Sequence, residues 1–249
     1  MASPVRMPAG INNVNYTAAT DVNGETNYNG ARNSHPLFMF PQPDPFRLIM
    51  DYSDFTTSPL AGQYTTTVVG TGTAAGITGV GGLYQLATSA GATDSVSVQD
   101  ATPNFAFAGT TQGWFHTLIT PSDATSSELL VGMLNSTTTP LTATDGFYFH
   151  KSSGGTAVDL VIKNAGVATT TAHIADMANA TAIKLSLYYD GRGTLNYYVN
   201  NVKVGIITDT TTFPLATVVL GTTFFILNAA AAIKTLVLDY YMAAAESTR

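Results

Sequence analysis

The residues that could do acid–base chemistry are few. The chain contains only three glutamates, Glu25, Glu128 and Glu246, which lie far apart in sequence. Most enzymes that hydrolyse a glycosidic bond need two carboxyl groups facing each other across that bond, one as acid and one as nucleophile or base. A strand carrying such a pair would show closely spaced carboxylates, and the glutamates do not. We therefore expect no glycosidase activity, and we predict that the chain is not an enzyme.

Metal-binding spacings are also missing. The four histidines, His35, His116, His150 and His173, form neither an i,i+4 pair nor an HExxH sequence, the spacings with which a helix presents imidazoles to zinc. Because the chain has no cysteine, a thiolate nucleophile, a disulfide and a sulfur-ligated metal are all excluded. We predict no metal site and no cofactor, and we interpret His116 as a core-edge or surface histidine.

Two glycine motifs resemble binding loops. Gly70-x-Gly72-x-x-Ala75 is similar to a dinucleotide-binding sequence, but no helical pattern follows it, so we interpret it as a flexible loop. Asp145 and Asp190 each precede a glycine. A loop carboxylate can hold calcium, but aspartate before glycine is also ordinary turn chemistry, which is the favoured interpretation.

Four aromatic residues could stack on a sugar ring: Trp114, Tyr188, Tyr197 and Tyr198. Trp114 opens a predicted strand and Tyr197 lies on the inward side of another, so both are expected to pack in the core. Tyr188 and Tyr198 point the other way in the strand alternation. Because tyrosine is enriched in interface centres, these two are the candidates for a contact with another subunit or a capsid.

The elements that position these residues are strands. From Ile183 to Ile207, apolar residues alternate with polar ones in three short runs, separated by Asp190–Gly193 and by Asn200-Asn201. Alternation with period two predicts strands with one buried face, and Gly and Asn supply the left-handed conformations of tight turns. The stretch therefore predicts a three-stranded meander, which needs a second sheet to cover its apolar face.

Further strands are predicted at short, regular intervals from Phe46 onward, and helix signals are weak, with at most one turn over Ile174–Ala180. The predicted strands are Arg47–Phe55, Tyr64–Val69, Leu83–Thr88, Ser95–Gln99, Trp114–Ile119, Leu129–Leu134, Gly146–His150, Val158–Lys163, Thr223–Leu227 and Lys234–Met242. We therefore predict an all-β fold, a two-sheet antiparallel sandwich over residues 46–249.

The first 45 residues differ from the rest. They are rich in Asn, Pro and Gly, and His35–Pro45 surrounds a small apolar cluster with four prolines, which favours an extended segment. On composition alone a disordered tail is favoured. The cluster Leu37, Phe38, Met39 and Phe40 also predicts an arm that becomes ordered against a neighbour, as a capsid or subunit contact.

The overall composition limits the partners. Charged residues make up 10% of the chain, and the net charge is −6. A free domain usually carries more than twice this share of charge, so part of the surface is expected to be covered by a partner, although Thr and Asn can also solvate a β-sheet. An acidic chain does not favour nucleic acid. No run is apolar enough to span a membrane, and no signal peptide is evident, so secretion is not expected.

A series of short motifs follows one another between Gly82 and Arg249. The motifs are Trp114-Phe115, Ser122–Thr125, Val131–Met133, Thr139–Leu141, Thr144–Lys151, Tyr188–Gly191, Tyr198–Asn201, Val204-Gly205, Asn228, Ala230–Ala232, Lys234–Tyr240 and Arg249. In this order and spacing they resemble a group of tailed-bacteriophage virion proteins. The resemblance covers two thirds of the chain and none of its first 80 residues. It implies a jelly roll of the concanavalin A-like, or LamG-like, superfamily and no catalytic residues.

The resemblance also implies a function. Members of that group are understood as capsid decoration, or cement, proteins, so we expect a homo-oligomer, dimer or trimer, that binds the phage major capsid protein on the outer surface of the virion and is made in the host cytoplasm. The alternatives are a carbohydrate-binding or host-adhesion module of the virion and a tail or fibre component. The same fold serves lectins, glucanases and virion parts, so fold alone does not decide between them.

Overall fold

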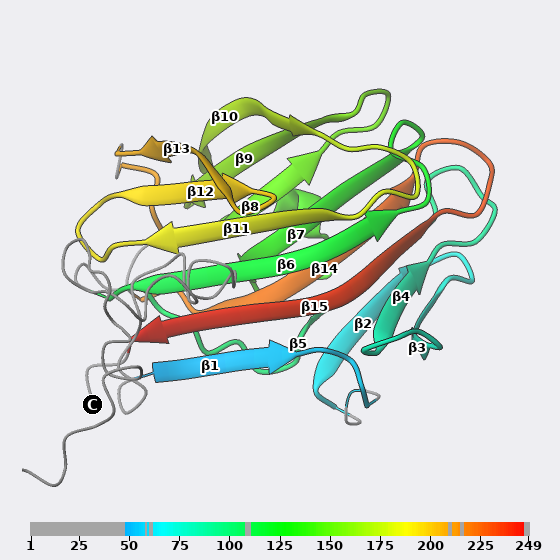
Figure 1. The fold of residues 1–249 in the computed structure, drawn as a ribbon, viewed down its shortest axis with the longest axis horizontal. Coiled ribbons are helices and arrows are strands. Elements are labelled where there is room, and N and C mark those ends of the chain that lie inside the picture. The colour runs from blue at the N-terminus through cyan, green and yellow to red at the C-terminus, as the bar shows by residue number, and fades with distance from the viewer. Residues whose placement is uncertain are drawn as a thin grey trace, which may run out of the picture. The chain divides into compact units, whose positions relative to one another are not determined.

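The computed structural model describes residues 48–57, 59, 62–107, 111–208, 211–214 and 217–246, which form two antiparallel β-sheets packed face to face (Figure 1). The predicted arm over residues 1–45, including Leu37, Phe38, Met39 and Phe40, lies outside the described residues. The predicted all-β sandwich is confirmed. Among the described residues, no helix is long and apolar enough to cross a membrane.

One sheet has eight strands. In spatial order they are β13 (Val202–Ile207), β12 (Leu195–Val199), β11 (Ile183–Tyr189), β6 (Gly113–Pro121), β15 (Thr235–Glu246), β4 (Leu83–Ala87) and β3 (Thr73–Ile77), with β1 (Leu48–Ser53) paired to β15. The long strand β15 pairs with β6 along one side and, along the other, with β4 in its first half and β1 in its second half.

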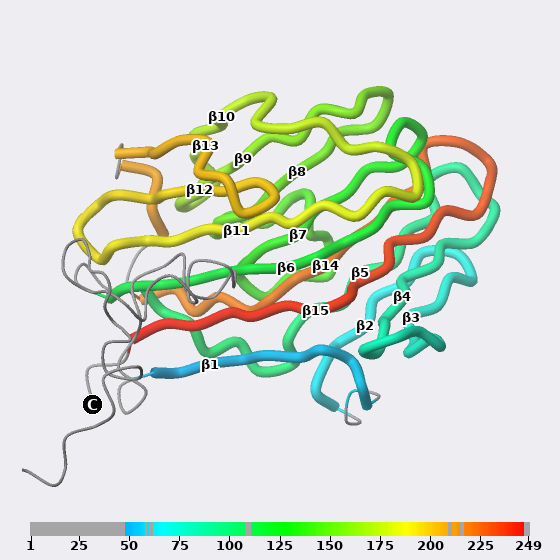
Figure 2. Tube along the Cα trace, in the orientation of Figure 1, coloured from blue at the N-terminus to red at the C-terminus, as the bar shows by residue number. Residues whose placement is uncertain are grey.

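The other sheet has seven strands. Their order is β10 (Val167–Asp176), β9 (Ala157–Asn164), β8 (Gly146–Lys151), β7 (Ser127–Asn135), β14 (Leu220–Asn228), β5 (Ser95–Asp100) and β2 (Tyr64–Val69). A short 3-10 helix, η2 (Pro140–Thr142), lies in the loop between β7 and β8. The tube in Figure 2 shows β7 and β14 running behind β6 and β15, so the middle strands of the two sheets face each other.

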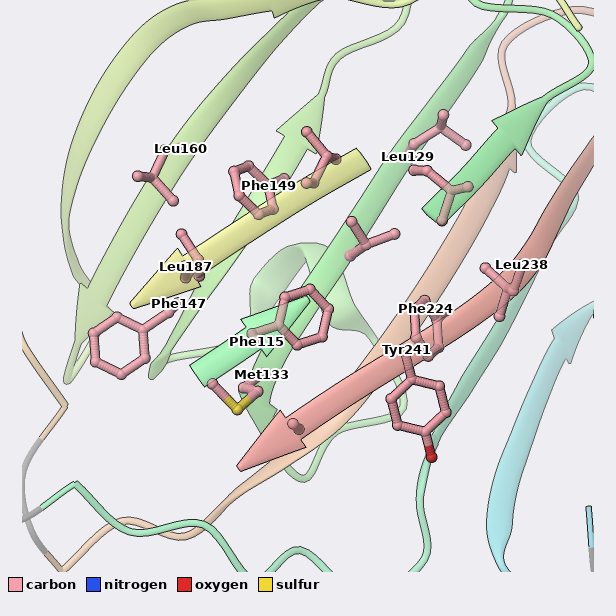
Figure 3. Packing of buried hydrophobic residues seen from close by; sticks show 14 of the residues in the cluster. Phe115, Leu129, Met133, Phe147, Phe149, Leu160, Leu187, Phe224, Leu238 and Tyr241 are labelled. Carbon is pink, nitrogen blue, oxygen red and sulfur yellow. The ribbon is translucent and has the colours of Figure 1, made fainter. Parts of the chain in front are cut away.

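The core fills the space between these sheets. Alternate residues of each strand point inward, and large side chains such as Phe115, Phe149, Phe224 and Tyr241 are completely or almost completely buried (Figure 3). Burying one such side chain contributes about 1.5–3 kcal/mol relative to leaving it in water. This single apolar layer joins the two sheets and fixes which face of every strand points outward.

The predicted meander is present as β11, β12 and β13. Tyr197 points into the core, and Asn200 and Asn201 form the second turn with φ angles of 49° and 69°. Both angles are left-handed, as a two-residue hairpin turn requires, and Asn adopts them at low cost. The pairing register shifts between Tyr197 and Tyr198, an irregularity that the alternation does not predict.

Two strands were not predicted from the sequence. The stretch interpreted as a flexible loop contains β3, which pairs with β4, and the possible helical turn over Ile174–Ala180 overlaps β10, which pairs with β9. Both are edge strands with mostly exposed residues. Without a buried face they show no clear alternation, so the neighbouring strand, rather than their own sequence, makes them extended.

Candidate functional site

A cavity of about 260 Å³ opens on the outer face of the seven-stranded sheet. Its lining comes from β2, β5, β14, the turn before β5 and the loop that contains η2. The lining residues are Thr67, Val69, Thr93, Ser95, Ser97, Thr138, Thr139, Pro140, Leu141, Thr142, Phe225 and Leu227.

Strand alternation places the floor of the cavity. Ser97 lies beside Phe225 across the β5–β14 pair, while their neighbours Val98 and Phe224 point into the core. Serine therefore occupies outward positions next to large apolar side chains of β14. The small serine side chains leave room above the sheet, and this room is the cavity.

The loop between β7 and β8 forms one wall. It is attached to the sheet by Gln99 of β5, whose Oε1 accepts the Thr137 backbone N–H at 2.9 Å and whose Nε2 donates to Thr223 Oγ1 at 2.6 Å. Within the loop, the Thr139 and Thr142 hydroxyls lie 2.7 Å apart, within hydrogen-bonding distance. These bonds give the wall a defined position before any ligand arrives.

The same loop covers a second apolar cluster on this outer face. Leu141 packs against a group of outward side chains that includes Leu130, Leu134, Tyr148 and Phe225. Phe225 belongs both to this cluster and to the cavity lining. The cavity is therefore the uncovered margin of an apolar patch, beside the loop that covers the remainder.

One residue of the cavity lining has a strained backbone. Thr93 has a φ of 79°, a left-handed conformation that is costly for a β-branched side chain. Its backbone N–H donates to Asn228 O at 3.0 Å, and the buried Asn228 side chain donates to Gly91 O at 3.0 Å. Residues held in such conformations cluster at ligand sites, so Thr93 adds to the case for a binding site here.

The chemistry of the cavity is neutral. Seven Ser and Thr residues and five apolar residues line it, apolar surface predominates, and no ionisable side chain is among the described lining residues. Each Ser or Thr hydroxyl can both donate and accept a hydrogen bond. The arrangement suits an uncharged ligand that has several hydroxyl groups and one apolar face.

Of the residues singled out from the sequence, Tyr188 and Tyr198 lie on the outer face of the other, eight-stranded sheet, on adjacent strands. The Tyr188 hydroxyl donates to Gln112 Oε1 at 2.8 Å. Both rings are buried, at 8% and 9% exposure. Neither Tyr188 nor Tyr198 lines the cavity.

Trp114 is buried, as predicted, but not between the sheets. It is 2% exposed and points outward in β6, where its ring centroid lies 5.6 Å from that of Tyr188. We call Trp114, Tyr188 and Tyr198 the aromatic group. Tyr197, in contrast, packs in the core between the sheets, as predicted.

The three histidines among the described residues have protein partners. His116 is buried and hydrogen-bonds through its two ring nitrogens to Ser186 Oγ and, at 3.0 Å, to Tyr240 Oη. The His150 Nε2 lies 2.8 Å from Glu128 Oε1, and the exposed His173 pairs with Asp176, which raises the pKa of His173. Within the described ranges, no group of three or more His, Asp or Glu residues could hold a metal ion.

Of the two aspartates that precede glycine, Asp190 acts within its own turn, where its Oδ1 accepts the Arg192 N–H at 2.7 Å. Asp145 instead makes a contact between distant segments, because its Oδ1 accepts the Ala165 N–H at 2.8 Å. The two glutamates among the described residues lie in different sheets, Glu128 on β7 and Glu246 on β15.

Comparison with known proteins places the fold. No protein-family model matches the sequence, and no curated protein matches it. Among solved structures, an endo-1,3-beta-glucanase from Streptomyces sioyaensis is similar over 84% of this chain and 99% of its own, with a TM-score of 0.59 and 10% identity. Peanut lectin is similar over 80% and 97%, with a TM-score of 0.55 and 9% identity.

A protein of unknown function from Shewanella oneidensis MR-1 is also similar, over 81% of this chain and 87% of its own, with a TM-score of 0.56 and 14% identity. The chain therefore has the concanavalin A-like jelly-roll fold of lectins and glucanases. At these identities the similarity establishes the fold alone, and enzymes and non-enzymatic lectins share it. The activity must be argued from the site.

Proposed function

We propose that this chain is a non-enzymatic carbohydrate-binding module and that the cavity beside Phe225 holds one neutral sugar ring. The observation that carries the proposal is the lining, a mostly apolar surface that also carries Ser and Thr hydroxyl groups and has no ionisable group. A pyranose has the complementary chemistry, because its hydroxyls radiate around a ring whose C–H face is apolar. A lectin of the same fold adds support at the level of fold.

The size of the cavity restricts the ligand. Pockets for drug-sized ligands are roughly 300–1,000 Å³, and this one is about 260 Å³. It suits a single terminal ring better than the interior of a long chain. Because burying a charge without a partner is costly, we expect neutral hexoses and N-acetylhexosamines to bind and uronic or sialic acids to be excluded.

The test is a titration of the purified protein with neutral and acidic monosaccharides, together with the variant Thr67→Trp. Thr67 lines the cavity from β2, so the larger ring should block it and weaken binding by about tenfold or more. Thr65→Trp is the matched control, because Thr65 is an exposed residue of the same strand outside the lining. Equal binding by both variants, or binding of no neutral sugar, would contradict the proposal.

A second candidate is a bacteriophage capsid decoration protein, a virion structural protein on the outer surface of the shell. The low charge and the motif resemblance across residues 82–249 support it. The partners would be the major capsid protein and further copies of this chain, as a dimer or trimer.

The mechanism of this second candidate would be thermodynamic. Binding only the mature shell stabilises that state by mass action. Contacts through residues 1–45, with Leu37, Phe38, Met39 and Phe40 as anchors, would add avidity across neighbouring capsomers. Residues 46–249 would supply the body.

Co-sedimentation with undecorated mature capsids tests the second candidate by counting the copies bound at saturation. We expect hundreds of copies per shell, and loss of binding when residues 1–45 are deleted, while circular dichroism shows a folded body. Binding unchanged by the deletion would contradict the arm contact. Absence of shell binding would contradict the second candidate, and carbohydrate binding would remain as the proposed function. The Thr67→Trp variant is expected to bind shells as the wild type does.

A further inference from the structure

Two carboxyl groups and two tyrosines meet between the sheets, away from the cavity. Asp51 of β1 and Tyr241 of β15 come from the eight-stranded sheet, and Tyr64 of β2 and Asp100 of β5 come from the seven-stranded sheet. We call these four residues the carboxyl–tyrosine cluster. Figure 3 shows Tyr241 among the core side chains, with its hydroxyl pointing away from Phe224.

Hydrogen bonds join the cluster across the sheets. The Tyr241 hydroxyl donates to Asp51 Oδ2 at 2.8 Å, and the Tyr64 and Tyr241 hydroxyls lie 2.6 Å apart. Asp100 is within hydrogen-bonding reach of the Asp51 carboxyl, and its Oδ2 accepts the Thr222 backbone N–H at 2.6 Å. These contacts therefore link β15 and β1 of the eight-stranded sheet to β5 and β14 of the seven-stranded sheet.

The charges in this cluster are unbalanced. In the described parts of the chain, no lysine, arginine or histidine pairs with either carboxyl group, and the titratable neighbours are Tyr64, Tyr241 and, further away, Tyr84. Two carboxylates that share a partly buried site between the sheets repel each other when both are ionised. One proton is therefore expected between them, and burial favours Asp100 as the group that holds it.

The environment of Asp100 favours the same placement. Burial, followed by the charge of Asp51, raises the pKa of Asp100 to about 7, although the Thr222 N–H opposes the shift. Burial also raises the pKa values of Tyr64 and Tyr241, so both phenols stay neutral. Near neutral pH, Asp100 is therefore expected to change its charge while the two phenols do not.

We propose that the carboxyl–tyrosine cluster is a proton-dependent clamp that fixes β1 to the opposite sheet. In the closed state the Asp100 carboxylic acid donates its proton to the Asp51 carboxylate, and Tyr241 donates to the same carboxylate. When Asp100 releases its proton to solvent, two like charges face each other. We expect the repulsion to loosen β1 rather than β5. Strand β1 pairs only with β15 and has no neighbour on its other side among the described strands.

The direction of the effect follows from linkage. The folded state binds the Asp100 proton more tightly than the unfolded chain, whose aspartates titrate near their usual value of about 3.9. The stabilisation is therefore fully present below about pH 4 and is lost as the pH rises toward about 7. This clamp does not depend on either proposed function and would operate with the cavity empty.

Hydrogen–deuterium exchange of the full chain tests the clamp. After correction for the intrinsic rate, amide protection in residues 48–53 should fall by about tenfold or more between about pH 5.5 and 8.5. Asp100→Asn keeps a hydrogen-bond donor and removes the titration, so its protection should stay constant over this range. Asp54→Asn is the control, since Asp54 is an exposed carboxylate just beyond β1 and should leave the wild-type profile unchanged.

Asp51→Asn provides a second route if Asp100→Asn does not fold. Removal of the facing charge should also flatten the pH profile of residues 48–53. A wild-type profile without pH dependence, or the same dependence in wild type and in the folded variant, would overturn the clamp.

Discussion

The two outer faces of the sandwich use the same alternation of strands but arrange their outward side chains differently. On the eight-stranded sheet, outward Trp114 packs against Tyr188, and both are almost completely buried. On the seven-stranded sheet, outward Phe225 and its apolar neighbours are covered by the loop that carries Leu141, and an open cavity remains beside the loop.

The difference shows that outward apolar residues can have two roles. They can pack completely and stabilise the fold, or they can border an open space in which a ligand could bind. A large ring that is fully packed adds buried area and offers no space to a ligand. Small residues such as Ser95 and Ser97 next to Phe225 leave space with hydroxyl groups around it. We therefore expect substitutions on the first face to change the free energy of unfolding and substitutions on the cavity walls to change ligand binding.

The largest effect is expected for Trp114→Ala. Removing a buried indole leaves a cavity and should lower the free energy of unfolding by about 3–5 kcal/mol. Urea unfolding followed by circular dichroism measures it, because Trp114 is the only tryptophan and fluorescence would lose its probe. Thr67→Ala on the cavity wall is the comparison and should change stability by about 0.5 kcal/mol or less. Similar decreases in the free energy of unfolding for both variants would contradict the proposed difference between the two faces.

An intermediate effect is expected for Gly132→Ala on the seven-stranded sheet. A Cβ at this position would lie 2.3 Å from Phe147 O and 2.5 Å from Tyr148 Cα, so β7 and β8 would have to shift. Overpacking of this kind costs about 1–3 kcal/mol. Gly155→Ala is the matched control, because a Cβ added to Gly155 would meet nothing within 4 Å. If thermal unfolding gives equal stabilities, the close packing of these two strands is not required.

The smallest effect is expected for Tyr188→Phe. The variant keeps the ring against Trp114 and loses the hydrogen bond to Gln112, which should cost about 1 kcal/mol. Tyr52→Phe is the control, because Tyr52 is 52% exposed on the same sheet face and should be close to neutral. A loss of several kcal/mol for Tyr188→Phe would mean that its hydroxyl, rather than ring packing, stabilises the aromatic group.

Much of the fold could be predicted from local patterns. The meander from Ile183 to Ile207 could be predicted because each strand has one buried face and each turn has Gly or Asn. Strands β3 and β10 could not, because their residues are mostly exposed and small or polar. Where no face is buried, the sequence carries no alternation to interpret.

The site was harder to predict because it depends on tertiary contacts. Thr67, Thr139 and Phe225 are distant in sequence and share one cavity only after the two halves of the sheet have paired. The outward direction of Trp114 could have been inferred, since its neighbour Phe115 is the inward residue of the same strand. Asp51 and Asp100 lie on different sheets, and no local pattern marks them as partners.

The positions of β14 and β15 have a consequence for the order of assembly during synthesis. Each is a central strand, β14 between β7 and β5, and β15 between β6 on one side and β4 and β1 on the other. They are also the last two strands of the described chain to leave the ribosome. Until then both sheets are incomplete, and their open edges can pair with other chains. At about 5–20 residues per second, the nascent protein would spend several seconds in this state, when a chaperone would be most useful.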